Sequence, residues 1–280
     1  MSKMNNPIIT LTTDFGTKDY FVGAVKGRIY SELPNAHVVD ISHKITPFSI
    51  NETAYVIKNA YKHFPKGSIH IIAVDAEWSI ENKHLVFLLD DHYFICANNG
   101  IMSLITFAIQ PQKVIEIKLP NTENDTYFLS NFVNSACHIA RGGNLDVIGK
   151  QTTEIKQIKE FKPFINEEKN QIIGNIIYVD NFGNVISNID KDTFNEIGKG
   201  RKFEIKVRYY TFDTILNKYN DIINFEAEVE KRNDDGKKLI LFNNDNLLEI
   251  AIYRSNLQSV GGASTLLGLN YRDTITVIFL

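Results

Sequence analysis

The first 75 residues alternate strand-like with helix-like patterns, and this alternation limits the chain to a few architectures. Three apolar, β-branched runs read PIITLTTD (7–14), HVVDIS (37–42) and SIHIIAVD (68–75), and such runs are typical of strands buried on both faces. Between them, apolar residues recur at the spacing of one helix face: Phe21, Val25, Ile29 and Leu33, then Ile50, Ala54, Ile57 and Tyr61. Strands that alternate with helices predict a mainly parallel sheet with helices on its faces.

Residues 84–143 continue this α/β pattern. The segment HLVFLLDDHYFICANNG predicts an antiparallel hairpin with its turn at Asp90 and Asp91, followed by a helix from about Ile101. The segment SNFVNSACHIARGG predicts a further helix, which the glycine pair 142–143 ends.

The charged segment 154–171 contains Pro163 and has no apolar period, so it is the best candidate for a domain boundary. After it, short strand-like runs separated by turn residues predict a small antiparallel barrel or sandwich. A length of 280 residues also favours two domains over one core. We therefore expect an α/β domain over residues 1–160, a linker over 161–171 and a β domain over 172–280.

Charge and cysteine content restrict the partners and the compartment. The chain has 30 basic and 33 acidic residues, a balance that argues against nucleic acid and membrane surfaces and favours a small-molecule partner. No segment approaches the roughly 18 consecutive apolar residues of a membrane span. The two cysteines, Cys96 and Cys137, lie in apolar runs and are expected to be buried thiols, which predicts a cytoplasmic protein.

Each of the three apolar runs ends at an acidic residue or shortly after one. Ligands of open parallel sheets bind beyond the carboxyl ends of the strands, so Asp14 and Asp75 are candidate site residues. Asp14 could instead cap the following helix, and for Asp40 a structural role is favoured. The glycine-rich loops of dinucleotide and P-loop phosphate sites are missing, and the seven histidines have no metal-ligand spacing, so no metal site is expected.

A second candidate site is the stretch YVDNFGNVISNI, residues 178–189. It predicts a tight turn between two strands that carries Asp180, Phe182 and Asn184, with Gly183 supplying backbone freedom. The same residues are also common in ordinary hairpin turns.

Several stretches, in this order and spread over nearly the whole chain, resemble the S-adenosylmethionine (SAM) hydroxide adenosyltransferase family, whose relatives include the fluorinase and chlorinase enzymes. They read ITLTTDFGTKDYFVGAVKG, VVDISHKI, FPKGSIHIIAVD, NNGIMSL, YVDNFGNVISNI and LLEIAIYRSN followed by ASTLLGL. The resemblance implies an N-terminal α/β domain, a C-terminal β-barrel and a homotrimer whose sites lie between neighbouring subunits. It also implies SAM as substrate, attacked at the ribose 5′-carbon with methionine leaving, and no metal or organic cofactor.

The resemblance assigns roles to particular residues. Asp14 corresponds to the aspartate that binds the ribose hydroxyls, and a carboxylate can accept two strong hydrogen bonds from such a diol. Asp180 and Asn184 correspond to groups that bind the methionine amine and adenine, with Phe182 as a stacking face. Asp75 corresponds to the aspartate of an Asp, Arg and His set that handles the attacking water.

The rest of that water-handling set differs in this chain. Asn82 and Lys83 stand where arginines are expected, and Tyr127 stands at the histidine position. Lys83, Tyr127, Glu81 or His84 could compensate for the missing arginine and histidine. Alternatively, these four could be ordinary loop residues. Two functions therefore stay open: a SAM hydrolase, slowed by the replacements, or a SAM or adenosine-binding homologue that has lost water activation.

Overall fold

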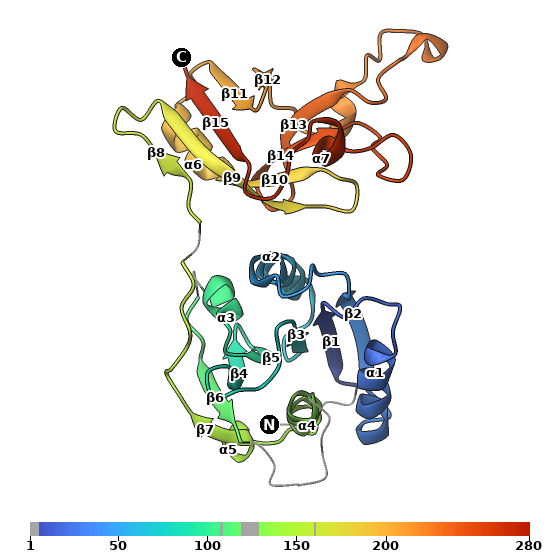
Figure 1. Cartoon of the computed structure of the whole chain (residues 1–280), viewed down its shortest axis with the longest axis vertical. Coiled ribbons are helices and arrows are strands. Elements are labelled where there is room, and N and C mark those ends of the chain that lie inside the picture. Colours follow the sequence, from blue (N-terminus) through green and yellow to red (C-terminus); the bar gives the residue numbers. More distant parts are fainter. Residues whose placement is uncertain (1–5, 107–108, 119–128, 160) are drawn as a thin grey trace. The chain divides into compact units, whose positions relative to one another are not determined.

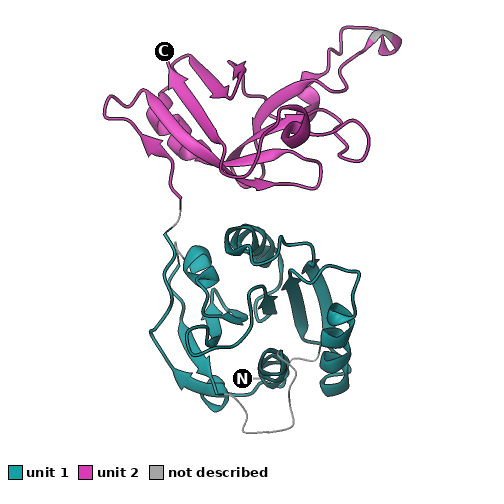
Figure 2. Ribbon diagram, viewed as in Figure 1, with its two compact units in different colours: residues 1–159 teal, residues 160–280 magenta. Residues whose placement is uncertain are grey.

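The computed structural model describes residues 6–106, 109–118, 129–159 and 161–280. The chain divides into two compact units, residues 1–159 and 160–280, each with its own hydrophobic core (Figure 1 and Figure 2). No helix in these described stretches is both long and apolar enough to cross a membrane.

The first unit is built on a seven-stranded sheet in the order β2-β1-β3-β5-β4-β6-β7. Its strands are β1 (Ile8–Thr13), β2 (His37–Ser42), β3 (Ile69–Ala73), β4 (His84–Leu89), β5 (His92–Ala97), β6 (Lys113–Ile117) and β7 (Gly149–Gln151). The four neighbours β2, β1, β3 and β5 pair in parallel, whereas β4, β6 and β7 join through antiparallel ladders.

Helices cover both faces of this sheet, and consecutive residues of β1, β3 and β5 are therefore buried. The helices are α1 (Phe21–Glu32), α2 (Ile50–Ala60), the short η1 (Tyr61–His63), α3 (Ile101–Ile105), α4 (Ser130–Ala140) and α5 (Leu145–Ile148). One core lies between the sheet and α1 with α4, and another lies between the opposite face and α2 with α3 (Figure 1). The predicted α/β fold with a mainly parallel arrangement is thus confirmed.

Local predictions in this unit also hold, with one correction. The turn between β4 and β5 uses Asp90 and Asp91 at φ values of +51° and +60°, the left-handed region that a two-residue hairpin loop requires. The expectation that HVVDIS is buried on both faces is wrong. This strand, β2, pairs with β1 alone and forms an edge of the sheet, so Val39 and Asp40 are exposed.

The second unit is an antiparallel, nearly closed barrel-like sheet, which confirms the predicted β-barrel. Its order is β12-β11-β15-β9-β10-β14-β13, with β8 also paired to β9. The strands are β8 (Phe164–Ile165), β9 (Gln171–Val179), β10 (Val185–Asp190), β11 (Phe203–Val207), β12 (Tyr210–Phe212), β13 (Lys238–Phe242), β14 (Leu247–Ile252) and β15 (Thr274–Phe279). The two ends of this order approach each other where Lys238 Nζ lies 4.5 Å from the Tyr210 ring centroid.

Some elements of this unit have no counterpart in the sequence-based expectations. Helix α6 (Lys191–Gly198) follows β10 and is capped by the Asp190 carboxylate, which accepts a hydrogen bond from the Thr193 amide at 2.7 Å. Strand β8 lies inside the stretch expected to be a linker. The remaining short elements are η3 (Tyr219–Ile222), η4 (Val229–Lys231) and α7 (Ala263–Leu266).

A buried histidine pair makes the first unit sensitive to acid. His70 lies 2.8 Å from the Thr10 hydroxyl and 3.1 Å from His92, and burial, with a smaller effect of His92, lowers the pKa of His70 to about 3. The unfolded chain takes up this proton near pH 6.5, whereas the folded chain does not. The free energy of unfolding therefore decreases as the pH falls below about 6.5. His70 alone contributes a decrease of about 1.4 kcal/mol per pH unit.

We expect His70→Gln to flatten the pH dependence of the free energy of unfolding on this acid side. Urea titrations from about pH 7 to about pH 5 measure it, with exposed His37→Gln as the matched control. Equal slopes for His70→Gln and the wild-type protein would contradict the assignment.

Candidate functional site

The carboxyl edge of the first sheet carries the two acidic residues singled out in the sequence. Asp14 directly follows β1, and Asp75 lies two residues beyond the end of β3. These strands are parallel neighbours in which Thr13 pairs with Ala73, so both aspartates lie at the same edge of the sheet.

Asp40 does not join them, because it lies inside β2 opposite Leu11. Its carboxylate contacts Lys26 Nζ at 2.6 Å and His43 Nε2 at 3.0 Å. Partial burial would raise the pKa of Asp40, but its contacts with Lys26 and His43 outweigh that effect and lower the pKa. Asp40 therefore has the structural role that the sequence favoured.

Asp14 is not a helix cap, because α1 begins at Phe21 and its N-cap is Tyr20. Instead, the Asp14 Oδ2 atom accepts a hydrogen bond from the Phe48 amide at 2.9 Å. Phe48 has a φ of +62°, a region that bulky residues rarely adopt, and 71% of it is exposed. Asp14 thus holds an exposed aromatic ring in a strained loop at the edge of the sheet, and strain of this kind is often found at functional sites.

Asp75 is held by its backbone while its carboxylate is left free. Its φ is +46°, and its carbonyl accepts hydrogen bonds from Asn82 Nδ2 at 3.0 Å and Asn99 Nδ2 at 3.1 Å. The side chain is exposed, and among the residues that the structure describes none donates a hydrogen bond to its carboxylate. This carboxylate is available to a water molecule or a ligand.

Asn82, which replaces an expected arginine, organises the loop after β3. Its Nδ2 donates to the Asp75 carbonyl at 3.0 Å and to the Glu77 carbonyl at 2.9 Å. Its Oδ1 is buried and has no hydrogen-bond partner within the described residues. A buried acceptor of this kind is costly unless water or a ligand satisfies it.

The other candidates for compensation have different surroundings. Lys83 pairs with Glu116 of β6 at 3.0 Å, and Glu81 is exposed. His84 is buried, its Nε2 lies 2.9 Å from the Ala76 carbonyl, and burial lowers its pKa even though that contact raises it. Tyr127 lies outside the described residues.

The second candidate site is the turn between β9 and β10, which lies in the second unit. Asp180 Oδ1 accepts hydrogen bonds from the amides of Phe182 and Asn184, both at 2.8 Å, and Oδ2 accepts one from Asn184 Nδ2 at 3.0 Å. Burial raises the pKa of Asp180, although these hydrogen bonds oppose that rise. Phe182 is 59% exposed, and the buried Asn184 Oδ1 has no hydrogen-bond partner in the described part of the chain.

Because Asp180 binds three groups of its own turn, we expect Asp180→Ala to destabilise the protein whether or not a ligand is present. Loss of a charged acceptor from several hydrogen bonds costs about 1.5–3 kcal/mol. Thermal unfolding of the free protein measures this effect, with exposed Asp192→Ala of the same unit as control. An unchanged melting temperature for Asp180→Ala would show that the turn does not depend on it.

Two further polar residues lie at the carboxyl edge of the first sheet and were not singled out in the sequence. His43 follows β2, is 6% exposed and lies 2.9 Å from the Thr13 hydroxyl. Asn99 follows β5, is 5% exposed and binds the backbone of Asp75. The strand-end rule that selected the aspartates would have found both, had it been applied to all polar residues.

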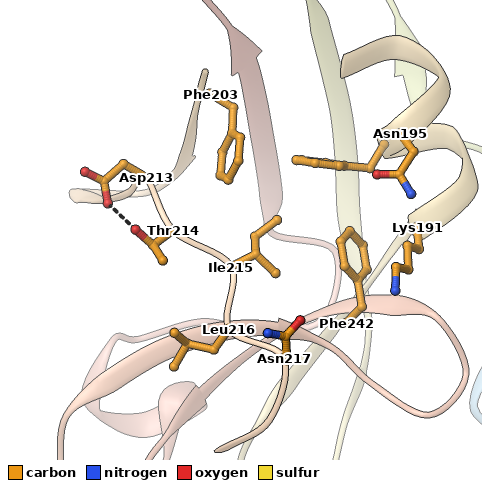
Figure 3. A pocket seen from close by; sticks show the side chains of 10 residues that line it. Lys191, Asn195, Phe203, Asp213, Thr214, Ile215, Leu216, Asn217 and Phe242 are labelled. Carbon is orange, nitrogen blue, oxygen red and sulfur yellow. Dashed lines mark hydrogen bonds between the residues drawn. The ribbon is translucent and has the colours of Figure 1, made fainter. Parts of the chain in front are cut away.

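A separate cavity of about 430 Å³ lies among α6, β11, β13 and the segment after β12 (Figure 3). Its apolar wall includes Phe194, whose ring centroid lies 5.2 Å from that of Phe203 and 5.5 Å from that of Phe242. The polar side chains that line it belong to Lys191, Asn195, Asp213, Thr214 and Asn217. None of the predicted site residues lines this cavity, so we do not assign substrate binding to it.

Comparison with known proteins gives two consecutive family matches. The SAM hydroxide adenosyltransferase N-terminal domain matches residues 9–149, and the C-terminal domain of the same family matches residues 174–276. The matches fall on the two separate units of the fold.

Individual relatives are similar over most of the chain. An (R)-S-adenosyl-L-methionine hydrolase of Methanocaldococcus jannaschii is 30% identical, over 97% of this chain and 96% of the relative. A fluorinase of an Actinoplanes species is 22% identical over 74% of this chain and 80% of its own. The crystal structure of an uncharacterized conserved protein from Thermotoga maritima has a TM-score of 0.80 and 25% identity, and the match covers 97% of this chain and 99% of that one.

Proposed function

The chain belongs to the SAM hydroxide adenosyltransferase family, and from this premise we propose that it hydrolyses SAM to adenosine and methionine. In the proposed reaction a water oxygen forms a bond to the ribose 5′-carbon while the bond from that carbon to the sulfonium sulfur breaks. Methionine leaves as a neutral thioether, so the leaving group needs no proton, and the water loses its proton to a base or to solvent. Orientation and partial desolvation of the water are then the main tasks of the protein.

The observation that carries this proposal is the pair of carboxylates at neighbouring strand ends. We assign the ribose hydroxyls to Asp14, whose Oδ1 is not used by the Phe48 contact. We assign the attacking water to the unpaired carboxylate of Asp75, with the buried Asn82 Oδ1 as a second acceptor near the same loop. The exposed ring of Phe48 offers an apolar face to the nucleoside.

We assign the other part of the proposed site to the turn between β9 and β10, contributed by a neighbouring subunit of the expected trimer. We assign the methionine amine and adenine to Asp180 and Asn184, and a stacking contact to Phe182. The free Oδ1 of Asn184 supports this assignment, since it is an acceptor without a protein partner among the described residues. The reaction as proposed needs no cofactor.

A binding protein without activity is the second candidate. It is supported by the replacement of expected arginine and histidine residues by Asn82 and Tyr127 and by the engagement of Lys83 with Glu116. Relatives named as hydrolases, the M. jannaschii protein among them, favour the enzyme.

We also propose that the protein acts as a homotrimer in the cytoplasm. The trimer is expected from the resemblance, and light scattering would then give a mass near three times 31.9 kDa. A cytoplasmic location is supported by the two free, buried cysteines, because disulfides are rare in reducing compartments. A purely monomeric protein would contradict the proposed assembly.

Chromatography of SAM incubated with the purified protein tests the proposed activity. Hydrolysis releases adenosine and methionine in equal amounts, at a rate proportional to protein concentration. Binding of SAM without release of adenosine would instead favour the binding protein.

A further inference from the structure

A chain of polar contacts runs from the surface of the first unit to the residue before Asp14. Lys26 of α1 contacts one Asp40 oxygen at 2.6 Å, and the other Asp40 oxygen lies 3.0 Å from His43 Nε2. On the other side of the imidazole ring, His43 Nδ1 lies 2.9 Å from the hydroxyl of Thr13. His43 and Thr13 are 6% and 1% exposed, so this part of the chain is shielded from water.

The chemistry of the partners limits what each ring nitrogen of His43 can do. Asp40 is a carboxylate that can only accept, and it lies 3.0 Å from His43 Nε2 as an electrostatic contact without the alignment of a hydrogen bond. The Thr13 hydroxyl can donate to His43 Nδ1 or accept from it, so the contact is available to either tautomer. The Thr13 oxygen in turn accepts from the Phe15 amide at 3.3 Å.

His43 also holds the same turn by its backbone. The His43 carbonyl accepts a hydrogen bond from the Gly16 amide at 2.7 Å. The turn over residues 13–16 is thus tied to His43 at both ends, at Thr13 and at Gly16. Asp14, which lies between these two ties, directs its Oδ2 to the Phe48 amide.

We propose that His43 is a positioning residue for Asp14, with Asp40 and Lys26 fixing the orientation of its imidazole ring. The Thr13 contact sets the backbone of the turn, and the turn sets the direction of the carboxylate. The proposal rests on the function proposed above in that it treats Asp14 as the group that binds the ribose hydroxyls. Carboxylates that are held in advance by such contacts lose less freedom when a ligand binds.

A matched set of threonine variants tests this role. Thr13→Val removes the hydroxyl at nearly constant shape, whereas Thr13→Ser retains it. Thr10→Val is the control, because Thr10 lies on the same strand and makes the same kind of contact to a buried histidine, His70, away from the carboxyl edge. Calorimetry with adenosine should show about tenfold weaker binding for Thr13→Val, near wild-type binding for Thr13→Ser and unchanged binding for Thr10→Val.

Two histidine variants separate the contacts of the ring. His43→Asn can keep an amide oxygen near the Nδ1 position, and His43→Gln reaches toward the Nε2 position instead. Adenosine affinity should be retained better by His43→Asn than by His43→Gln, since the first preserves an acceptor for Thr13. The reverse order would overturn the proposed role of the Thr13 contact.

Amide hydrogen exchange of Phe48 gives a readout that needs no substrate, because this amide is bound by Asp14. Faster exchange in Thr13→Val and His43→Gln, but not in Thr10→Val, is the expected result. Unchanged Phe48 exchange in Thr13→Val, or an equal loss of adenosine affinity in Thr10→Val, would overturn the proposal. If wild-type protein bound no adenosine while Phe48 exchange responded as expected, the proposed function would fail and the positioning of Asp14 by His43 would stand.

Discussion

Asp75→Asn is expected to slow SAM hydrolysis by about 10²–10⁴-fold while adenosine binds with nearly unchanged affinity. The carboxylate is exposed and has no protein partner among the described residues, so it can act on water, whereas the amide of asparagine is a poor base. Asparagine is the appropriate replacement because it tolerates the φ of +46° better than alanine does. Adenosine release from SAM, followed by chromatography, measures the effect.

Asp90→Asn is the matched control for this experiment. Asp90 also has a left-handed backbone, with a φ of +51°, but it lies in the hairpin turn between β4 and β5. The control should hydrolyse SAM at the wild-type rate. Full-speed hydrolysis by Asp75→Asn would show that the water is handled by other residues.

Asp14→Ala is expected to weaken adenosine binding by about 10- to 150-fold, because loss of a charge-assisted hydrogen-bonding group costs about 1.5–3 kcal/mol. One oxygen of the carboxylate accepts a hydrogen bond from the Phe48 amide, which leaves the other oxygen for the ribose diol. Calorimetry with adenosine measures the change.

Asp40→Ala is the comparison for Asp14→Ala. Asp40 lies inside β2 and acts on Asp14 only through His43, so its loss should weaken adenosine binding less than the loss of Asp14 itself. Asp14→Asn keeps an acceptor for the Phe48 amide but loses the charge, so an intermediate loss is expected. Equal affinities of Asp14→Ala and the wild-type protein would refute the assignment of the ribose to Asp14.

The positions of Asp14 and Asp75 could be predicted because strand ends are encoded locally. Apolar β-branched runs end at these residues, and parallel pairing then brings the ends to one edge of the sheet. The hairpin at Asp90 and Asp91 and the helix ended near Gly142 were predictable for the same reason, since turn and cap residues act within a few positions.

Other features depend on neighbours that are distant in sequence. The run HVVDIS has the composition of a central strand, and only the sheet order makes it an edge with Asp40 in its interior. The contacts of Asn82 with two backbone carbonyls depend on the path of the loop after β3. The contact between His43 and Thr13 spans 30 positions and depends on the pairing of β1 with β2.

Helix α6 is a different case, because its signal was present but weak. Asp190 and Thr193 form a local capping contact, yet the helix has only eight residues and follows directly on β10. Short helices contain few apolar repeats, and the sequence on both sides of α6 has the pattern of strands. The helix was therefore hard to recognise.

Hydrolysis of SAM in water enriched in oxygen-18 tests the central claim most directly. Attack of water at the ribose 5′-carbon predicts one labelled oxygen in each adenosine released and none in methionine, as measured by mass spectrometry. Labelled adenosine should form in proportion to the amount of wild-type protein, and Asp75→Asn should form it much more slowly. Adenosine without the label, or SAM bound by the protein and recovered intact, would contradict the account.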